Sequence, residues 1–141
     1  NAMSQTEATR EVVTSYLAAL KRGDLDALRA SFRPDATWSL RGDLPVSGTW
    51  TGPSGIIDTF LARMMERIDT SQDMSQQVHG VIVDGDTAVA EWTTRATTRD
   101  GQLYENDYAV VFVVRAGQIA HVREYFDTAY AQRVLFAGAS V

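Results

Sequence analysis

The spacing of apolar residues changes once along this chain, and this change constrains the fold more than any other feature. Before residue 70, apolar residues recur every three or four positions, as they do on one face of a helix. The first such stripe consists of Ala8, Val12, Tyr16 and Leu20. From Met74 onward the repeat is two, which is typical of strands. A helical first half followed by strands predicts an α+β fold, in which helices and strands form separate layers.

Turn and capping residues divide the chain into elements. Ser4 and Glu7 form a capping box before the first helix, Gly23 ends it, and Asp24 begins a second helix that includes Phe32. The expected helices cover residues 4–22, 24–33 and 53–68, with a closing helical turn at 129–136. The expected strands cover residues 37–40, 78–83, 87–98, 103–114 and 118–126. Segments 84–86 and 115–117 have the chemistry of hairpin turns.

The long strands carry apolar side chains on both faces, which has a consequence for assembly. In segment 103–114 one face carries Tyr108, Val110 and Phe112, and the other carries Ala109, Val111 and Val113. A sheet that is covered on one side only should alternate cleanly between apolar and polar residues. The second face therefore needs a cover, and we expect a homodimer.

Composition excludes several classes of function. The 141 residues carry a formal net charge of −5, with no basic run, which argues against a nucleic-acid partner. The absence of cysteine excludes disulfides and thiolate sites. The longest apolar run, residues 109–114, is too short to cross a membrane, and no signal peptide is expected. Asn1 and Ala2 are interpreted as a tag remnant, residues 3–141 as one domain, and the expected location is the cytoplasm.

Three segments resemble one superfamily. The stretch VVTSYLAALKRGDLDALRASFRPDATW (residues 12–38) resembles the opening of ketosteroid isomerases and SnoaL-like polyketide cyclases. GQIAHVREYFDTA (117–129) is similar to the last strand of the SnoaL-like group and of limonene-epoxide hydrolases, and WTGPSGIIDTF (50–60) to their third-helix entry. The resemblance implies the nuclear transport factor 2-like fold. This is a cone-shaped, cystatin-like roll, with three N-terminal helices packed in a curved antiparallel (mixed) sheet.

The resemblance also implies roles for individual positions. Tyr16 stands where ketosteroid isomerases have an oxyanion-donating tyrosine, and Tyr108, or alternatively Asp107, stands at their second donor. Leu40 occupies the position of their catalytic base, and leucine cannot take a proton. Glu124 aligns with the last-strand aspartate of the epoxide hydrolases. The other two positions of that Asp-Arg-Asp group fall near Trp92 and Thr94, so the group is incomplete.

Strand alternation predicts which side chains line a pocket. If residues 115–117 form a three-residue turn, Val114 pairs with Gln118, Tyr108 lies opposite Glu124, and Asn106 lies opposite Phe126. Residues two apart share a face. The expected pocket residues are therefore Asn106, Tyr108, Val122, Glu124 and Phe126, with Trp92, Thr94, Trp38, Leu40 and Tyr16 around them. His79 joins them in one hairpin register.

Glu124 is the sharpest catalytic candidate, because it interrupts an otherwise apolar strand. Desolvation there should raise the pKa of its carboxyl and suit it to acid–base work, unless it pairs with Arg95, Arg99 or Arg123 or lies at a solvated rim. Tyr16 and Tyr108 are candidate hydrogen-bond donors to an oxyanion, or core tyrosines with satisfied hydroxyls. His79 and His121 do not form a metal site, because no carboxylate stands at ligand spacing. We expect His121 at the dimer contact.

Three hypotheses for function follow. The first is a cofactor-free enzyme for a small, apolar, oxygen-bearing molecule, which transfers a proton beside a carbonyl as an isomerase, cyclase or dehydratase does. The second is a binding domain with the same pocket and no chemistry. The third is a hydrolase of the epoxide type, in which Glu124 activates water beside Asn106 or His79.

Overall fold

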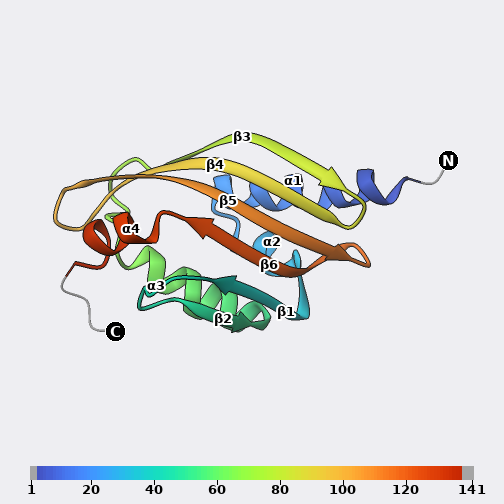
Figure 1. Ribbon diagram of the computed structural model, residues 1–141, viewed down its shortest axis with the longest axis horizontal. Coiled ribbons are helices and arrows are strands. Elements are labelled where there is room, and N and C mark those ends of the chain that lie inside the picture. Colours follow the sequence, from blue (N-terminus) through green and yellow to red (C-terminus); the bar gives the residue numbers. More distant parts are fainter. Residues whose placement is uncertain (1–2, 138–141) are drawn as a thin grey trace.

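The computed structural model describes residues 3–137 (Figure 1). The expected tag remnant at residues 1–2 and the last four residues of the expected domain lie outside the described residues. The helices are α1 (Gln5–Arg22), α2 (Leu25–Ala30), the π-helical segment η1 (Ser54–Leu61), α3 (Ala62–Met65) and α4 (Thr128–Val134). The strands are β1 (Phe32–Leu40), β2 (Gly48–Thr51), β3 (Ser75–Asp84), β4 (Thr87–Thr97), β5 (Leu103–Arg115) and β6 (Gln118–Phe126). No described helix is long and apolar enough to span a membrane.

One curved sheet organises the molecule, and it confirms the expected cone-shaped α+β fold. Its strand order is β2-β1-β6-β5-β4-β3. The sheet is mixed, because β1 runs parallel to β6 while the other neighbours are antiparallel. Helices α1 and α2 lie behind β4, β5 and β6, and α3 lies beside β1 and β2 (Figure 1). The face turned toward the helices is called the inner face below, and the opposite one the outer face.

The ends of α1 form as the sequence predicts. The Ser4 hydroxyl accepts a hydrogen bond from the Glu7 backbone N–H at 3.1 Å, which satisfies a donor that the first turn leaves free. At the other end Gly23 adopts φ 69°, a left-handed conformation that glycine adopts without steric cost. Asp24 and Asp127 cap α2 and α4 in the same way as Ser4 caps α1.

Three element predictions are wrong. Helix α2 ends before Phe32, because the Ser31 carbonyl accepts a hydrogen bond from the Ile119 N–H at 2.8 Å and the chain then joins the sheet. A four-residue edge strand, β2, was not among the expected strands, and it pairs with β1 so that Trp50 lies opposite Trp38. The third helix is split into η1 and α3, although its apolar residues keep helical spacing.

The β5–β6 hairpin has a different register from the expected one. Ala116 (φ 51°) and Gly117 (φ 79°) form a two-residue turn with both φ angles positive, the signature of type I′, so Arg115 pairs with Gln118. A bulge between Val113 and Val114 adds another shift. Tyr108 consequently lies opposite Phe126, and Val110 lies opposite Glu124. The total displacement is two residues, so every side chain stays on its expected face.

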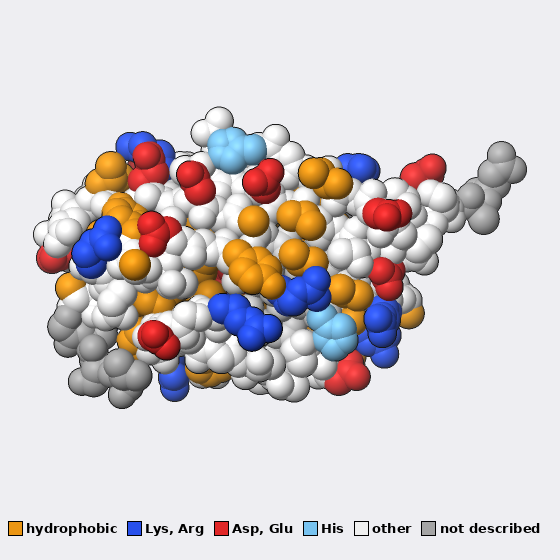
Figure 2. Space-filling model, viewed as in Figure 1, with side chains coloured by type: hydrophobic (Ala, Val, Ile, Leu, Met, Phe, Trp, Pro, Cys, Tyr) orange, Lys and Arg blue, Asp and Glu red, His pale blue; other side chains and the backbone are white. Residues whose placement is uncertain are grey.

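The two faces of the sheet differ in burial. Along β4 the residues Ala88, Ala90, Trp92 and Thr94 are buried on the inner face. The outer face is mixed, whereas the sequence predicted an apolar one. Its apolar part is a patch made of Val89, Ala109, Val111 and the 43% exposed Tyr125, which lie side by side in the register of β4, β5 and β6. Figure 2 shows hydrophobic side chains over the middle of this face, with charged side chains around them.

Candidate functional site

A cavity of about 100 Å³ lies between the inner face of the sheet and the helices. Most of its wall is apolar. Helices α1 and α2, η1 and α3 supply aliphatic and aromatic side chains, and the polar groups come from the strands and from the Tyr16 hydroxyl of α1. Its lining consists of Tyr16, Leu20, Leu28, Phe32, Trp38, Ile56, Ile57, Phe60, Leu61, Met64, Met65, Ile68, Met74, Gln76, Trp92, Thr94, Tyr104, Tyr108, Glu124 and Leu135. Among these described residues, Glu124 is the one charged side chain.

Glu124 projects from β6 into this apolar space. The residue is 7% exposed, and the Trp38 indole N–H donates to its Oε1 at 3.2 Å. Burial raises the pKa of the Glu124 carboxyl to about 7, and the hydrogen bond from Trp38 opposes that rise. Within the described residues no ion pair reaches this carboxyl, and Arg95 pairs with Glu105 instead. The carboxyl is therefore a desolvated group that titrates near neutral pH.

Tyr16 and Trp38 bring two other elements to the carboxyl. Tyr16 comes from α1, is 4% exposed, and its ring lies 5.5 Å from that of Phe112 and 6.5 Å from that of Trp38. Burial raises the pKa of its hydroxyl far above the usual value, and the charge of Glu124 adds to this rise. At neutral pH the Tyr16 hydroxyl is consequently a neutral O–H donor close to Glu124.

Three side chains of β5 form a hydrogen-bonded chain on the inner face. Asn106 Nδ2 donates to the Tyr104 hydroxyl at 2.9 Å and to the Asp127 carbonyl at 3.0 Å. The Asn106 Oδ1 accepts from the Asp107 N–H, and these two backbone partners fix the orientation of the amide. The hydroxyls of Tyr104 and Tyr108 lie 2.6 Å apart. Either hydroxyl can donate this bond, because the Tyr104 oxygen can accept from Asn106 and from Tyr108 at once. When Tyr104 donates it, the Tyr108 O–H is left to donate to a ligand.

Two residues of β4 that line the cavity carry buried polar atoms. Trp92 is 3% exposed and Thr94 is 5% exposed. The indole Nε1 of Trp92 and the hydroxyl of Thr94 have no hydrogen-bond partner among the described residues. The Trp92 ring stacks on Tyr108 with centroids 5.8 Å apart and planes 15° apart, which fixes the direction of its N–H.

Comparison with known proteins assigns the family. The profile of the SnoaL-like domain matches residues 13–122. The chain belongs to the SnoaL-like family. A search of curated proteins finds no significant match.

Solved structures share the fold of this SnoaL-like domain. A nuclear transport factor 2-like protein from Burkholderia thailandensis is 25% identical, with a TM-score of 0.78 and 98% of each chain covered. TerC, co-crystallised with polyporic acid, is 22% identical, with a TM-score of 0.80 and 92% and 98% covered. A protein of ketosteroid isomerase-like fold from Catenulispora acidiphila, in complex with trimethylamine, is 19% identical, with a TM-score of 0.72 and 89% and 92% covered.

The structure of the SnoaL-like domain brings six of the predicted site residues into the cavity wall. These six are Tyr16, Trp38, Trp92, Thr94, Tyr108 and Glu124. Four others lie behind the wall. Leu40 is buried beside Glu124 in the parallel β1–β6 pairing, and Val122 is buried beside Trp38. Phe126 packs on Tyr108 with ring centroids 4.6 Å apart, and Asn106 acts through Tyr104.

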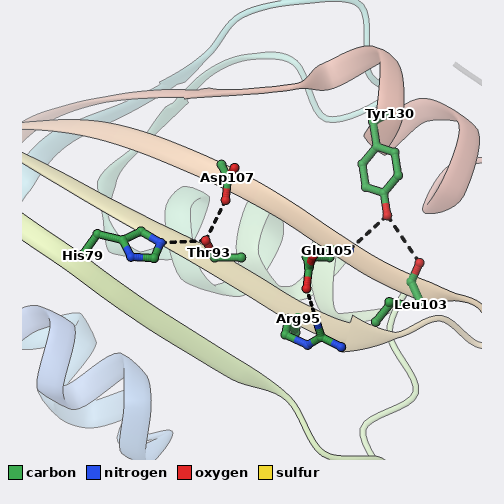
Figure 3. A network of polar contacts seen from close by, with 7 residues as sticks. All are labelled: His79, Thr93, Arg95, Leu103, Glu105, Asp107 and Tyr130. Carbon is green, nitrogen blue, oxygen red and sulfur yellow. Dashed lines mark hydrogen bonds and ion pairs between the residues drawn. The ribbon is translucent and has the colours of Figure 1, made fainter.

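His79 does not reach the cavity, because a bulge between Val78 and Gly80 turns it to the outer face. Its Nε2 lies 2.7 Å from the Thr93 hydroxyl, which donates to Asp107 Oδ1 at 2.6 Å (Figure 3). The hydroxyl thus lies between the imidazole and the carboxylate, and Nε2 must donate to it. A nucleophile triad needs the imidazole in the middle. His79 therefore has neither a place in the pocket nor the geometry of a base.

Sequence reasoning missed Tyr104 and the helical part of the wall. Tyr104 lies two residues before Asn106 on the same face of β5, so the alternation that selected Asn106 and Tyr108 selects it too. The apolar residues of η1 and α3, which the sequence indicated only as a helical repeat, line the cavity. His121 lies on the outer face, where its Nδ1 is 2.8 Å from the Thr37 hydroxyl. Within the described residues no cluster of three metal-ligating side chains is found.

Proposed function

We propose that this SnoaL-like domain binds a small, apolar, oxygen-bearing molecule and moves a proton beside its carbonyl group without a cofactor. The observation that carries the proposal is the buried carboxyl of Glu124, whose pKa of about 7 makes it both a usable base and a usable acid at neutral pH. The reaction class is that of an isomerase, cyclase or dehydratase. The family contains small-molecule binders, and two of the structural neighbours were crystallised with polyporic acid and with trimethylamine.

The proposed step conserves charge within the cavity. The Glu124 carboxylate removes a proton from the carbon beside the carbonyl, and the electron pair of that C–H bond moves into an enolate. The enolate oxygen accepts hydrogen bonds from Tyr16 and Tyr108, whose hydroxyls stay protonated because burial raises their pKa values. The new carboxylic acid of Glu124 then returns its proton to a different carbon of the same molecule. No second base is required.

The experiment uses 2-tetralone, a ketone whose carbon-bound protons exchange measurably. Its exchange with deuterated water is followed by NMR in the presence of the protein. We expect Glu124→Gln to lower the protein-dependent exchange rate by at least ~100-fold, the usual scale for acid–base catalysis. The rate for the unsubstituted protein should rise with pH around 7, where the base form of Glu124 accumulates. Glu105→Gln, on the outer face, is the matched control and should leave the rate unchanged.

A binding domain without chemistry is the second candidate. It is favoured by Leu40, which lies directly beside Glu124 in the sheet and offers no second proton acceptor. Binding of 2-tetralone with no protein-dependent exchange would support this candidate against the first. The geometry disfavours a water-adding hydrolase, because His79 lies on the outer face and the Asn106 amide is already engaged by Tyr104, Asp127 and Asp107.

We also propose that a second copy of the chain covers the apolar patch of the outer face. The patch is centred on Ala109 and Val111, where the neighbouring strands contribute Val89 and Tyr125. A charge at Tyr125 would be desolvated in such an interface and should dissociate it. Sedimentation of the protein and of Tyr125→Glu tests this expectation. A monomer in both cases would contradict it.

A further inference from the structure

The polar atoms of Trp92 and Thr94 are the feature of the cavity that the proposed proton transfer leaves unused. Interior polar groups are nearly always hydrogen-bonded, because burying one without a partner destabilises the fold. Here two buried atoms, Trp92 Nε1 and Thr94 Oγ1, have no hydrogen-bond partner among residues 3–137, and they belong to residues two apart on one strand that both line the cavity. We propose that they form a second ligand subsite, which hydrogen-bonds a neutral hydroxyl at the end of the ligand remote from its carbonyl.

The sheet register separates this subsite from Glu124. Glu124 lies opposite Val110 of β5, whereas Trp92 lies opposite Tyr108 and Thr94 opposite Asn106. Measured along β5, the partner of Trp92 is therefore two residues, or ~7 Å, from the partner of Glu124. The partner of Thr94 is four residues, or ~13 Å, from it. A molecule with one oxygen at each end can place its carbonyl at Glu124 and its second oxygen at this subsite. The inference rests on the proposed function for the position of the carbonyl.

The donors and acceptors of the subsite define the chemistry of that second oxygen. The indole N–H of Trp92 can only donate, whereas the hydroxyl of Thr94 can donate or accept. A ligand hydroxyl satisfies both, since it accepts from Trp92 and donates to Thr94. A carboxylate or phosphate is disfavoured, because Glu124 is the one charged side chain among the described residues of the lining. Gln76, which pairs with Thr94 across β3 and β4, adds a further neutral polar group.

The subsite also lies toward the exposed end of the cavity. Met74 and Gln76 belong to the lining, and Met74 is 42% exposed. Glu124, in contrast, lies beside the buried Leu40 of β1 and the indole of Trp38. The ligand is thus oriented with its reacting carbonyl inward and its hydroxyl toward the opening.

A matched pair of probes tests the subsite. 2-Tetralone and 6-hydroxy-2-tetralone differ by one hydroxyl on the ring remote from the carbonyl. We expect the hydroxylated probe to bind the protein roughly tenfold more tightly, the scale of one or two net hydrogen bonds. Thr94→Val, which replaces the hydroxyl by a methyl group, should remove most of this preference. Thr93→Val, on the same strand but the opposite face, should keep it.

Trp92→Phe is the second variant, and it should also remove most of the preference. The ratio of the two affinities within one variant is the quantity compared, so a change in packing that weakens both probes equally cancels. Equal affinities for the two probes in the unsubstituted protein, including no measurable binding of either, would overturn the proposal. A preference that persists in both Thr94→Val and Trp92→Phe would overturn it as well.

A direct readout comes from the indole protons. The chain has three tryptophans, and Trp92→Phe identifies the Trp92 signal among the three indole N–H resonances. We expect 6-hydroxy-2-tetralone to move that signal downfield and 2-tetralone to move it much less. Failure here is distinguishable from failure of the proposed function: Glu124→Gln should lose exchange catalysis and keep the preference for the hydroxylated probe. A preference without any exchange activity would leave the subsite standing and refute the proton transfer.

Discussion

Two sets of three hydrogen-bonded side chains lie on opposite faces of the same sheet. On the inner face Asn106 and Tyr104 are joined at 2.9 Å and Tyr104 and Tyr108 at 2.6 Å. On the outer face His79 and Thr93 are joined at 2.7 Å, and Thr93 and Asp107 at 2.6 Å. The distances are nearly equal, and Asn106 and Asp107 are consecutive residues. The surroundings differ: all three members are buried inside, whereas His79 and Asp107 are exposed outside.

The difference shows that burial, rather than geometry, decides what such groups can do. Water replaces a lost hydrogen bond on the outer face at little cost, so the His79–Thr93–Asp107 chain has little influence on stability or chemistry. On the inner face no water competes in the same way. There burial raises the pKa values of the tyrosines, and it raises the pKa of Glu124 so that its carboxyl is a weaker acid than a solvated one. Hydrogen bonds from neighbouring groups also fix the direction of each donor.

The largest expected effect is the contribution of Glu124 to the pH dependence of the free energy of unfolding. The folded protein holds the Glu124 proton more tightly than the unfolded chain, because burial raises the pKa from 4.5 to about 7. Protonation therefore favours the fold. This contribution is complete below pH 4.5, declines as pH rises toward 7, and is lost above it. The two pKa values correspond to ~3 kcal/mol in the free energy of unfolding.

Urea unfolding of the protein and of Glu124→Gln, between pH 4.5 and 8, measures this contribution. Glutamine is neutral at every pH, so the two proteins should be similar near pH 4.5, and the variant should be more stable by up to ~3 kcal/mol at pH 8. Other titrating groups are common to both proteins and cancel in the difference. If the difference in the free energy of unfolding between the two proteins were constant across this range, Glu124 would be solvated. The inner face would then not differ from the outer face at this residue.

Most of the fold could be predicted from the sequence, because hydrophobic period and capping residues act locally. The alternation in β4 and β5 assigned Trp92, Thr94 and Tyr108 to the buried face, and Glu124 was recognised as a polar residue in an apolar strand. These assignments survive an error of two residues in hairpin register, because a shift by two leaves each side chain on its face. The family resemblance added Tyr16, whose position on a separate helix no strand pattern could supply.

The rest depended on details that the local sequence does not specify. His79 was misplaced because a bulge between Val78 and Gly80 changes which side chains face inward. A glycine inside a strand is a sign of such a bulge, but it does not by itself fix the register. The pairing of β1 with β6, which brings Trp38 to Glu124, joins segments more than 80 residues apart. That Trp92 Nε1 and Thr94 Oγ1 find no partner in the described part of the chain is likewise a property of three-dimensional packing.

The next largest expected effect on stability is at Tyr104, the middle member of the hydrogen-bonded set on the inner face. Tyr104→Phe removes the hydroxyl that accepts from Asn106 and shares a hydrogen bond with Tyr108, and Tyr104 is 1% exposed. One hydrogen of the Asn106 amide is then buried without a partner, and we expect the free energy of unfolding to fall by ~1–3 kcal/mol. The variant should also slow exchange of 2-tetralone less than Tyr108→Phe does, because Tyr108 itself would contact the enolate. Urea unfolding and the exchange assay measure the two quantities.

The smallest expected effect on stability is at Thr93, the middle member of the hydrogen-bonded set on the outer face. Thr93→Val removes the hydroxyl between His79 and Asp107, in the same structural role as Tyr104 on the inner face. Both flanking side chains are exposed, so water takes over their hydrogen bonds, and the free energy of unfolding should change by less than ~0.5 kcal/mol. Valine also suits a strand at least as well as threonine. Urea unfolding of this variant and of Tyr104→Phe in one series compares the two faces, since each hydrogen-bonded set has three members at similar distances.

A loss of stability in Thr93→Val as large as that in Tyr104→Phe would show that the outer face is also shielded from water. A second copy of the chain on this face would have that effect, and the two faces would then not differ in the assembled protein.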